Sequence, residues 1–238
     1  ANTSGRPSTT TAAHCMEDLK GRVEAVVDGG SCTIGLESTI VDVSGEEPVL
    51  LRPGAVTREM LREALGRDIA VDPAVKKPLE KDEHPKAPGM KYRHYAPKAP
   101  MIIIEAEAGE GADRESRTAE RMIELALRER SEGRKLGLIA SSEVCGLVLE
   151  ALSEEGTGAP ESRRLGSLHI YDTESMVIMD LGRSTQEKSW AHELFAALRE
   201  MDEEDVDRIL AEGVDESDIG FAVMNRLRKA AGGNVIKA

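Results

Sequence analysis

Aromatic residues are scarce in this sequence, at 3% of 238 residues. The hydrophobic core must therefore be built mainly from leucine, isoleucine, valine, alanine and methionine. Hydrophobic residues make up 40% of the chain and charged residues 32%, a composition typical of a soluble globular protein. The chain is long enough for one large domain or two ordinary ones, each with its own core.

Long apolar runs and paired cysteines are also missing. No apolar run approaches the ~20 residues that a membrane-spanning helix needs, and no signal peptide is recognisable. The three cysteines, Cys15, Cys32 and Cys145, are widely separated and form no C-x-x-C pair. Reduced thiols are their simplest interpretation, so we expect a cytoplasmic protein with no membrane association, and we assign no metal ligands.

Basic residues are also fewer than acidic residues. Lysine and arginine number 31 against 44 acidic residues, which gives a net charge of −13. A surface that grips tRNA or duplex nucleic acid needs a basic footprint, so stable direct tRNA binding is not expected. A few arginines and backbone N–H groups can still bind one polyphosphate.

A proline-rich stretch divides the sequence. Residues 71–100 hold six of the ten prolines and many lysines and glutamates, which is typical of a linker. Residues 1–70 before it are turn-dense and predict a short helix over 58–65, capped by Thr57 and ended by Gly66. The strands predicted in this first domain cover residues 23–27, 32–36, 38–43 and 49–51.

Residues 101–238 alternate between strand-like and helix-like patterns. The predicted strands cover 101–105, 136–140, 164–171 and 206–211, the last of which could instead end a helix. The predicted helices cover 113–131, 143–153, 185–201 and 219–231. This alternation predicts a Rossmann-like α/β domain. No G-x-G-x-x-G motif follows its first strand, so no dinucleotide site is expected.

Four segments carry groups that could bind an anionic ligand. Residues 2–10 concentrate hydroxyls, an amide and Gly5, and could present many donors to phosphate oxygens. Ser38 lies between two apolar strand segments and could bond a carboxylate or phosphate. Arg52 ends a strand before Pro-Gly and is suited to a bidentate anion contact. Taken singly, the three segments are better explained by an ordinary flexible terminus, outward-facing strand hydroxyls and a surface arginine at a turn.

The fourth segment is the linker motif. Residues 88–97, PGMKYRHYAP, contain Tyr92 and Tyr95, two of the three tyrosines in the chain. A passive spacer has little reason to contain aromatics, so we interpret the motif as a docking segment. The tyrosines could stack on a ligand, or they could anchor an interface between domains.

Taken together and in order, these segments resemble the L-threonylcarbamoyladenylate (threonylcarbamoyl-AMP) synthase family, whose catalytic module is the YrdC-like domain. The segments that carry the resemblance are residues 1–8, 28–30, 35–42, 51–54, 88–97, 194–199, 211–213 and 222–227. The resemblance covers the whole chain. It implies that residues 1–70 are the C-terminal part of a YrdC-like domain with a twisted mixed sheet, that 71–100 are the linker, and that 101–238 are the Rossmann-like domain of the two-domain members.

The resemblance also implies a reaction, in which L-threonine, bicarbonate and ATP give threonylcarbamoyl-adenylate and pyrophosphate. ATP is a substrate, and Mg²⁺ is expected with it. Other proteins would pass the threonylcarbamoyl group to tRNA, so this enzyme need not hold tRNA itself.

The resemblance suggests roles for particular residues. Asn2, Thr10 and Arg52 would bind ATP, Ser38 would bind threonine, and Tyr92 and Tyr95 would close over the ATP. Catalysis would consist mostly of positioning and charge neutralisation, so no proton-transfer residue is assigned.

The sequence departs from the family pattern at its start. The Lys-x-Arg motif of the family and the neighbouring threonine-binding residues precede the loop at residues 1–10, and no substitute for them occurs before the linker. We therefore expect an N-terminally truncated, inactive fragment with an exposed apolar surface. The alternatives are a non-catalytic nucleotide-binding or regulatory protein and, less favoured by the linker motif, another carbamoyl-transfer enzyme.

Overall fold

A seven-stranded sheet forms the larger half of the protein in the computed structural model, which describes residues 1–77, 84–88, 95–106, 114–154 and 159–238. Its strand order is β10-β4-β9-β5-β8-β7-β6. The parallel strands are β4 (Met101–Glu105), β5 (Leu136–Ala140), β8 (Met176–Asp180), β9 (Arg208–Glu212) and β10 (Val235–Lys237). The antiparallel hairpin of β6 (Glu161–Leu165) and β7 (Leu168–Asp172) extends one edge.

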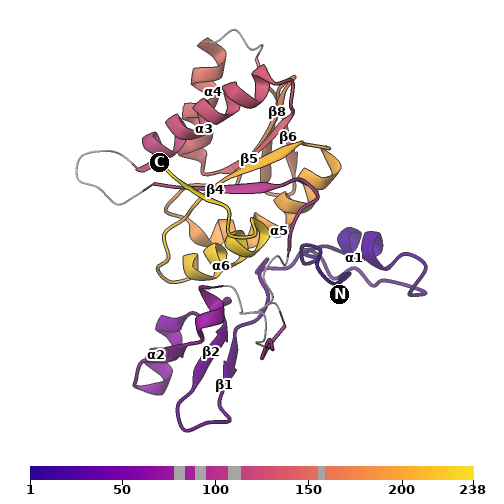
Figure 1. Ribbon diagram of the computed structural model, residues 1–238. Helices are drawn as coiled ribbons and strands as arrows, with labels where there is room; N and C mark the ends of the chain where they lie inside the picture. Colours follow the sequence, from indigo (N-terminus) through magenta and orange to yellow (C-terminus); the bar gives the residue numbers. More distant parts are fainter. Residues whose placement is uncertain (78–83, 89–94, 107–113, 155–158) are drawn as a thin grey trace.

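Helices cover both faces of this sheet (Figure 1). Along β4 and β9, consecutive residues point to opposite faces, as the period of a strand requires. Ile103 and Ile209 enter one core with α5 (Glu187–Glu203) and α6 (Gly220–Ala230). Ile104 and Leu210 enter the other core with α3 (Arg114–Ser131) and α4 (Ser142–Glu154). This three-layer arrangement confirms the predicted Rossmann-like α/β architecture.

A smaller mixed sheet lies in the N-terminal part of the chain. Its order is β1-β2-β3, with β1 antiparallel and β3 parallel to β2. These strands are β1 (Ile40–Asp42), β2 (Val49–Arg52) and β3 (Ala70–Val71), followed by the short 3-10 helix η1 (Pro73–Val75). Figure 1 shows this sheet and the N-terminal helix on the side of the molecule where α5 and α6 lie.

The helix α2 (Arg58–Leu65) follows its sequence signals closely. The hydroxyl of Thr57 accepts a hydrogen bond from the Met60 N–H at 3.3 Å, and Gly66 ends the helix with φ of 67°. Both devices satisfy backbone groups that a helix end leaves unpaired. The predicted helix and its two caps are confirmed.

Two strand predictions for the first 43 residues are wrong, and a third is confirmed only in part. Residues 23–27 and 32–36 form no strand, and only Ile40–Asp42 of the predicted strand 38–43 does. Val27 is 94% exposed and does not pack on a sheet, so the β propensity of this residue is not sufficient to form a strand. Residues expected to form only loop and polar turns contain α1 (Ala12–Leu19), which Thr11 caps by accepting from the His14 N–H.

The strand predicted over residues 164–171 is instead a hairpin. β6 and β7 are joined by a tight turn in which Gly166 adopts φ of 62°, a left-handed conformation that glycine reaches without steric cost. The next strand, β8, is absent from the prediction because its apolar residues follow the hairpin almost directly. The predicted strand over 206–211 corresponds to β9.

The carboxyl end of β9 buries an acid. Glu212 is 3% exposed and accepts a hydrogen bond from the Ser141 N–H at 2.7 Å. Burial raises the pKa of its carboxyl to about 7, although the Ser141 amide and the charge of Arg114 act in the opposite direction. The folded state therefore holds the Glu212 proton more tightly than the unfolded state does.

This raised pKa predicts a pH-dependent stability difference. The stability that Glu212 contributes is full below pH 4.5 and is lost as the pH rises through about 7. Relative to wild type, Glu212→Gln is expected to gain about 2–3 kcal/mol in free energy of unfolding over that interval. Urea titrations at several pH values measure this gain. Glu105→Gln is the control, because Lys237 and Arg228 outweigh burial and lower the pKa of Glu105, and a gain in both variants would contradict the assignment.

Candidate functional site

Ser38 and Arg52 come together where β1 meets β2. Ile40 pairs with Arg52 in the antiparallel register, which brings the segment before β1 beside the end of β2. The Arg52 guanidinium donates to the Ser38 carbonyl at 2.9 Å and to the Ser38 hydroxyl at 3.1 Å. It also donates to the carbonyl of Pro88, the first residue of the linker motif, at 3.4 Å. Ser38 is exposed and Arg52 half-buried, so a ligand in solvent can reach the pair.

Glu37 lies beneath this pair and joins two distant parts of the chain. Its carboxylate accepts hydrogen bonds from the Ser8 hydroxyl and, at 2.9 Å, from the Nε of Arg226 on α6. Burial alone would raise the pKa of Glu37, but the charge of Arg226 and the Ser8 hydroxyl outweigh it and hold the pKa below its usual value. Glu37 is therefore an anion at neutral pH, with both partners supplied by other segments.

Gly54 allows the two segments to approach each other closely. A Cβ at this position would lie 2.5 Å from the Glu37 carbonyl oxygen and 2.6 Å from the Thr39 nitrogen. Both are backbone atoms that cannot rotate away. Only glycine fits between the end of β2 and the segment that carries Ser38.

Gly54→Ala is expected to lower the free energy of unfolding by about 1–3 kcal/mol, because the backbone around Ser38 must shift to admit the methyl group. Urea denaturation measures the change. Gly45→Ala is the matched control, since the nearest atom to its added Cβ is 3.9 Å away. Equal stability of the two variants would contradict the close packing at Gly54.

Asn2 and Thr10 occupy the N-terminal loop. The Asn2 amide donates to the carbonyls of Thr3 and Arg6, at 3.1 and 3.4 Å. Thr10 is buried, and its N–H and hydroxyl both contact Nδ1 of His14 at 3.2 Å. In the part of the chain that the structure describes, no hydrogen bond joins these two residues to the Ser38–Arg52 pair.

The N-terminal loop borders a hollow of about 250 Å³. Its lining combines hydroxyl-bearing residues of the loop with a glycine-rich turn; among these residues are Thr9, Thr10, Thr11, Asp28, Gly29 and Gly30. Hydroxyls and glycine backbone are groups that can surround a phosphate chain. Two of the segments that the sequence analysis singled out thus share one hollow.

Tyr95 is buried at the contact between the two halves of the protein. Its N–H donates to the Gly5 carbonyl at 3.1 Å, and its ring centroid lies 5.1 Å from that of Phe195. Burial raises the pKa of its hydroxyl. This geometry favours the interface-anchor interpretation of Tyr95. Tyr92 lies outside the described residues.

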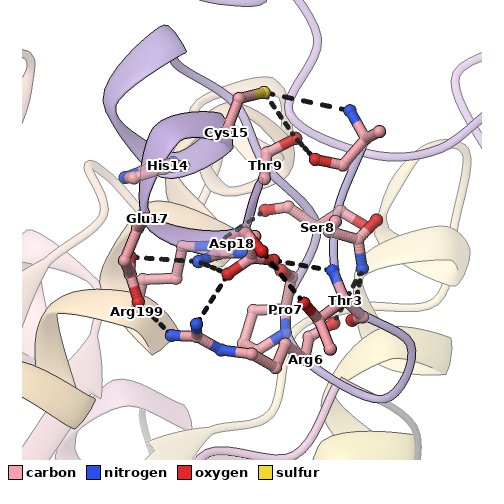
Figure 2. A network of polar contacts seen from close by, with 12 residues as sticks. Thr3, Arg6, Pro7, Ser8, Thr9, His14, Cys15, Glu17, Asp18 and Arg199 are labelled. Carbon is pink, nitrogen blue, oxygen red and sulfur yellow. Dashed lines mark hydrogen bonds and ion pairs between the residues drawn. The ribbon is translucent and has the colours of Figure 1, made fainter. Parts of the chain in front are cut away.

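Arg199 of α5 holds the N-terminal loop in place (Figure 2). Its guanidinium donates to the Pro7 carbonyl at 2.6 Å and to the Asp18 carboxylate at 2.9 Å, and it pairs with Glu17 at 3.2 Å. The Asp18 side chain is fully buried and also accepts from the Thr3 N–H and from Arg6. Burial would raise the pKa of Asp18, but Arg199, the Thr3 amide and Arg6 outweigh it and lower the pKa.

Sequence reasoning missed Glu37, Asp18, Arg199 and Arg226. Glu37, Arg199 and Arg226 fall inside the segments that carry the family resemblance, and this was the signal that could have identified them. In the described ranges, no group of three histidine, cysteine or acidic side chains is placed to hold a metal ion. No helix in those ranges is both long and apolar enough to cross a bilayer.

Two protein families match the chain. The model described as "Threonylcarbamoyl-AMP synthase, C-terminal domain" covers residues 56–232. The model described as "Telomere recombination" covers residues 1–54. Together the two matches cover the N-terminal loop, the small sheet, the linker and every strand of the large sheet except β10.

Named relatives extend over the whole chain. It is 40% identical over 237 residues to the threonylcarbamoyl-AMP synthase of Pyrococcus abyssi and 37% identical to that of Bacillus subtilis. All of this chain is covered in both cases, but only 58% and 57% of those proteins, so the chain spans somewhat more than half their length. The crystal structure of P. abyssi Sua5 complexed with L-threonine matches with a TM-score of 0.75 and 39% identity, over 100% of this chain and 58% of that one.

Proposed function

The chain belongs to the family that carries the threonylcarbamoyl-AMP synthase C-terminal domain, and from this premise we propose that it forms part of a threonylcarbamoyl-AMP synthase. In the proposed reaction the threonine amine condenses with bicarbonate to give a carbamate and water. A carbamate oxygen then attacks the α-phosphate of ATP, and the bond from the α-phosphate to pyrophosphate breaks. Threonylcarbamoyl-AMP and pyrophosphate result. The product would supply the proteins that modify tRNA, and the proposed site of action is the cytoplasm.

The Ser38–Arg52 pair is the observation that carries this proposal. Arg52 offers a guanidinium beside an exposed hydroxyl, and Arg226 and Gly54 fix the backbone around both residues. Arg52 would neutralise charge on the ATP phosphates, and Ser38 would bind threonine. A fixed cation aimed at developing phosphate charge lowers the barrier to transfer without reorganisation during the reaction.

The remaining residues assigned to ATP have supporting roles in the proposal. Thr10 borders the hollow at the N-terminal loop, Asn2 orders the turn before it, and Tyr92 and Tyr95 belong to the segment that follows Pro88. The described residues offer no cluster of carboxylates for Mg²⁺. We therefore assign that ion no protein ligand and derive no step through it.

Pyrophosphate release tests the proposal. The natural full-length polypeptide that contains this chain is expected to release pyrophosphate from ATP only when L-threonine and bicarbonate are both present. Omission of either substrate, and replacement of threonine by alanine, are the controls. ATP binding without any threonine-dependent release would overturn the proposal and favour a non-catalytic nucleotide-binding protein.

A further inference from the structure

Arg226 belongs to the large sheet domain, but most of its partners belong to the proposed site. It lies on α6, and its side chain is 0% exposed. Its Nε donates to the Glu37 carboxylate and its Nη1 to the Pro53 carbonyl, both at 2.9 Å. The sequence separations of these contacts are 189 and 173 residues. One side chain of the C-terminal domain thus bridges both segments of the N-terminal sheet that enter the site.

The two contacts flank the pair that is proposed to bind substrates. Glu37 directly precedes Ser38, and Pro53 directly follows Arg52. With the Glu37 carboxylate and the Pro53 carbonyl held by one rigid guanidinium, the two backbones keep a fixed separation. On the solvent side, the hydrogen bonds from Arg52 to Ser38 join the same two segments directly. Arg226 therefore sets the geometry of the pair without touching what the pair would bind.

Neighbouring residues in turn fix Arg226. Nη1 also donates to the Asn225 side-chain carbonyl at 2.9 Å, and the Asn225 amide donates to the Val75 carbonyl at 2.7 Å. The guanidinium carbon lies 5.7 Å from the centre of the Tyr95 ring, within range of a cation–π contact. These contacts, from α6 and from residues 71–100, restrain the side chain and hold its charge in one place.

Stability alone does not account for an arginine at this position. Its Nη2 is buried and has no hydrogen-bond partner among the residues that the structure describes. A buried donor left unpaired costs free energy, and well-packed apolar residues often replace a buried ion pair without loss of stability. A role of the charge in positioning the Glu37 and Pro53 segments explains why an arginine is present despite this cost in stability.

A second arginine of the same helical layer supports the arrangement. Ser8 donates through its hydroxyl to Glu37, and its carbonyl accepts from the Nε of Arg199 on α5 at 3.4 Å. The contacts therefore run without a break from Arg199 through Ser8 and Glu37 to Arg226. Helices α5 and α6 together hold the N-terminal loop against the Ser38 segment.

We propose that Arg226 is a positioning residue for the synthase reaction, through which the C-terminal domain holds the Ser38–Arg52 pair in its productive geometry. This inference rests on the proposed function. It gives the large domain an indirect part in substrate binding, exerted through Glu37 and Pro53.

Steady-state kinetics of the natural full-length polypeptide test this role. Arg226→Met is expected to raise the KM for both ATP and threonine, and to lower kcat, by about tenfold to a hundredfold, the range that follows from misplacement of binding groups by up to an ångström. Arg226→Lys is expected to recover part of the loss. A lysine keeps the charge near Glu37 but cannot hold the Pro53 carbonyl at the same time.

Arg228→Met is the matched control on the same helix. Arg228 also pairs with carboxylates, those of Glu105 and Glu216, but neither lies in the proposed site. This variant is expected to keep both KM values and kcat within about twofold of wild type, since its half-buried ion pairs lie outside the proposed site. Thermal melts of every variant show that the assays use folded protein.

Folded Arg226→Met with wild-type KM values would overturn the inference, and so would equal losses in the Arg228→Met control. If Arg226→Met does not fold, Glu37→Gln takes its place, because it keeps the side-chain volume and removes the charge that orients Arg226. It must then raise both KM values for the inference to stand. An inactive wild type overturns the proposed function and this inference with it, whereas an active wild type with an unaffected variant overturns this inference alone.

Discussion

Arg199→Met is expected to lower the free energy of unfolding by about 3–5 kcal/mol. The substitution leaves the Asp18 carboxylate fully buried, with Arg6 and the Thr3 N–H as its remaining partners. It also removes the contact at 2.6 Å that ties the Pro7 carbonyl to α5. Loss of the main partner of a buried charge lowers the free energy of unfolding by far more than a surface ion pair raises it. Urea denaturation with a fluorescence readout from Trp190, a buried residue of α5 itself, measures the loss.

Arg67→Met is the control for this prediction. Arg67 pairs with Glu47 at 2.9 Å, but both side chains are largely exposed, so its removal is expected to cost less than about 1 kcal/mol. A loss below about 1 kcal/mol for Arg199→Met as well would show that the N-terminal loop does not depend on α5.

The same ion pair predicts a dependence of stability on acid. The pKa of Asp18 is below its usual value, so its contribution is present above the unfolded value of 3.8 and is lost as the pH falls through the folded pKa. Arg199→Met is therefore expected to differ most from wild type near neutral pH. The difference should shrink in acid, as urea titrations below pH 4 would measure.

Arg52→Ala has the largest effect expected on ligand binding. It is expected to weaken ATP binding by about 1.5–3 kcal/mol, the usual contribution of a hydrogen bond to a charged group. Isothermal titration of the natural full-length polypeptide with ATP measures the change directly. Arg58→Ala is the control, since Arg58 lies on α2 and pairs with Asp68 outside the site. Unchanged ATP affinity in Arg52→Ala would contradict the assignment of Arg52 to ATP binding.

Local signals predicted the elements that depend on local chemistry. Thr57 and Gly66 fix the ends of α2 through hydrogen bonds within four residues, and the sequence shows both. The apolar runs of β4 and β5 predicted strands, and both lie in the parallel part of the sheet, where helices cover the two faces. These elements were recovered almost to the residue.

Elements that depend on a pairing partner were predicted less well. Residues 23–27 have strand-like composition, but no strand in the described part of the chain pairs with them. The β6–β7 hairpin was read as one strand, because the turn at Gly166 is only two residues long. Composition indicates a preference for strand, but a strand forms only where the rest of the fold supplies a pairing partner.

The site shows the same division. Ser38 and Arg52 were singled out from residue type and family resemblance, and the register of β1 and β2 brings them into contact. Arg199 and Arg226 are ordinary helical arginines in the sequence. Their partners Pro7 and Glu37 are 192 and 189 residues away, and only the folded chain brings them together.

Incorporation of labelled bicarbonate tests the central claim most directly. The natural full-length polypeptide that contains this chain would be incubated with ATP, L-threonine and ¹³C-bicarbonate, and the products identified by mass spectrometry. We expect an adenylate that carries both threonine and the labelled carbon, with strongly reduced yield in Arg52→Ala. Pyrophosphate release without the labelled adenylate, or equal yields from wild type and Arg52→Ala, would contradict a synthase site built on Ser38 and Arg52.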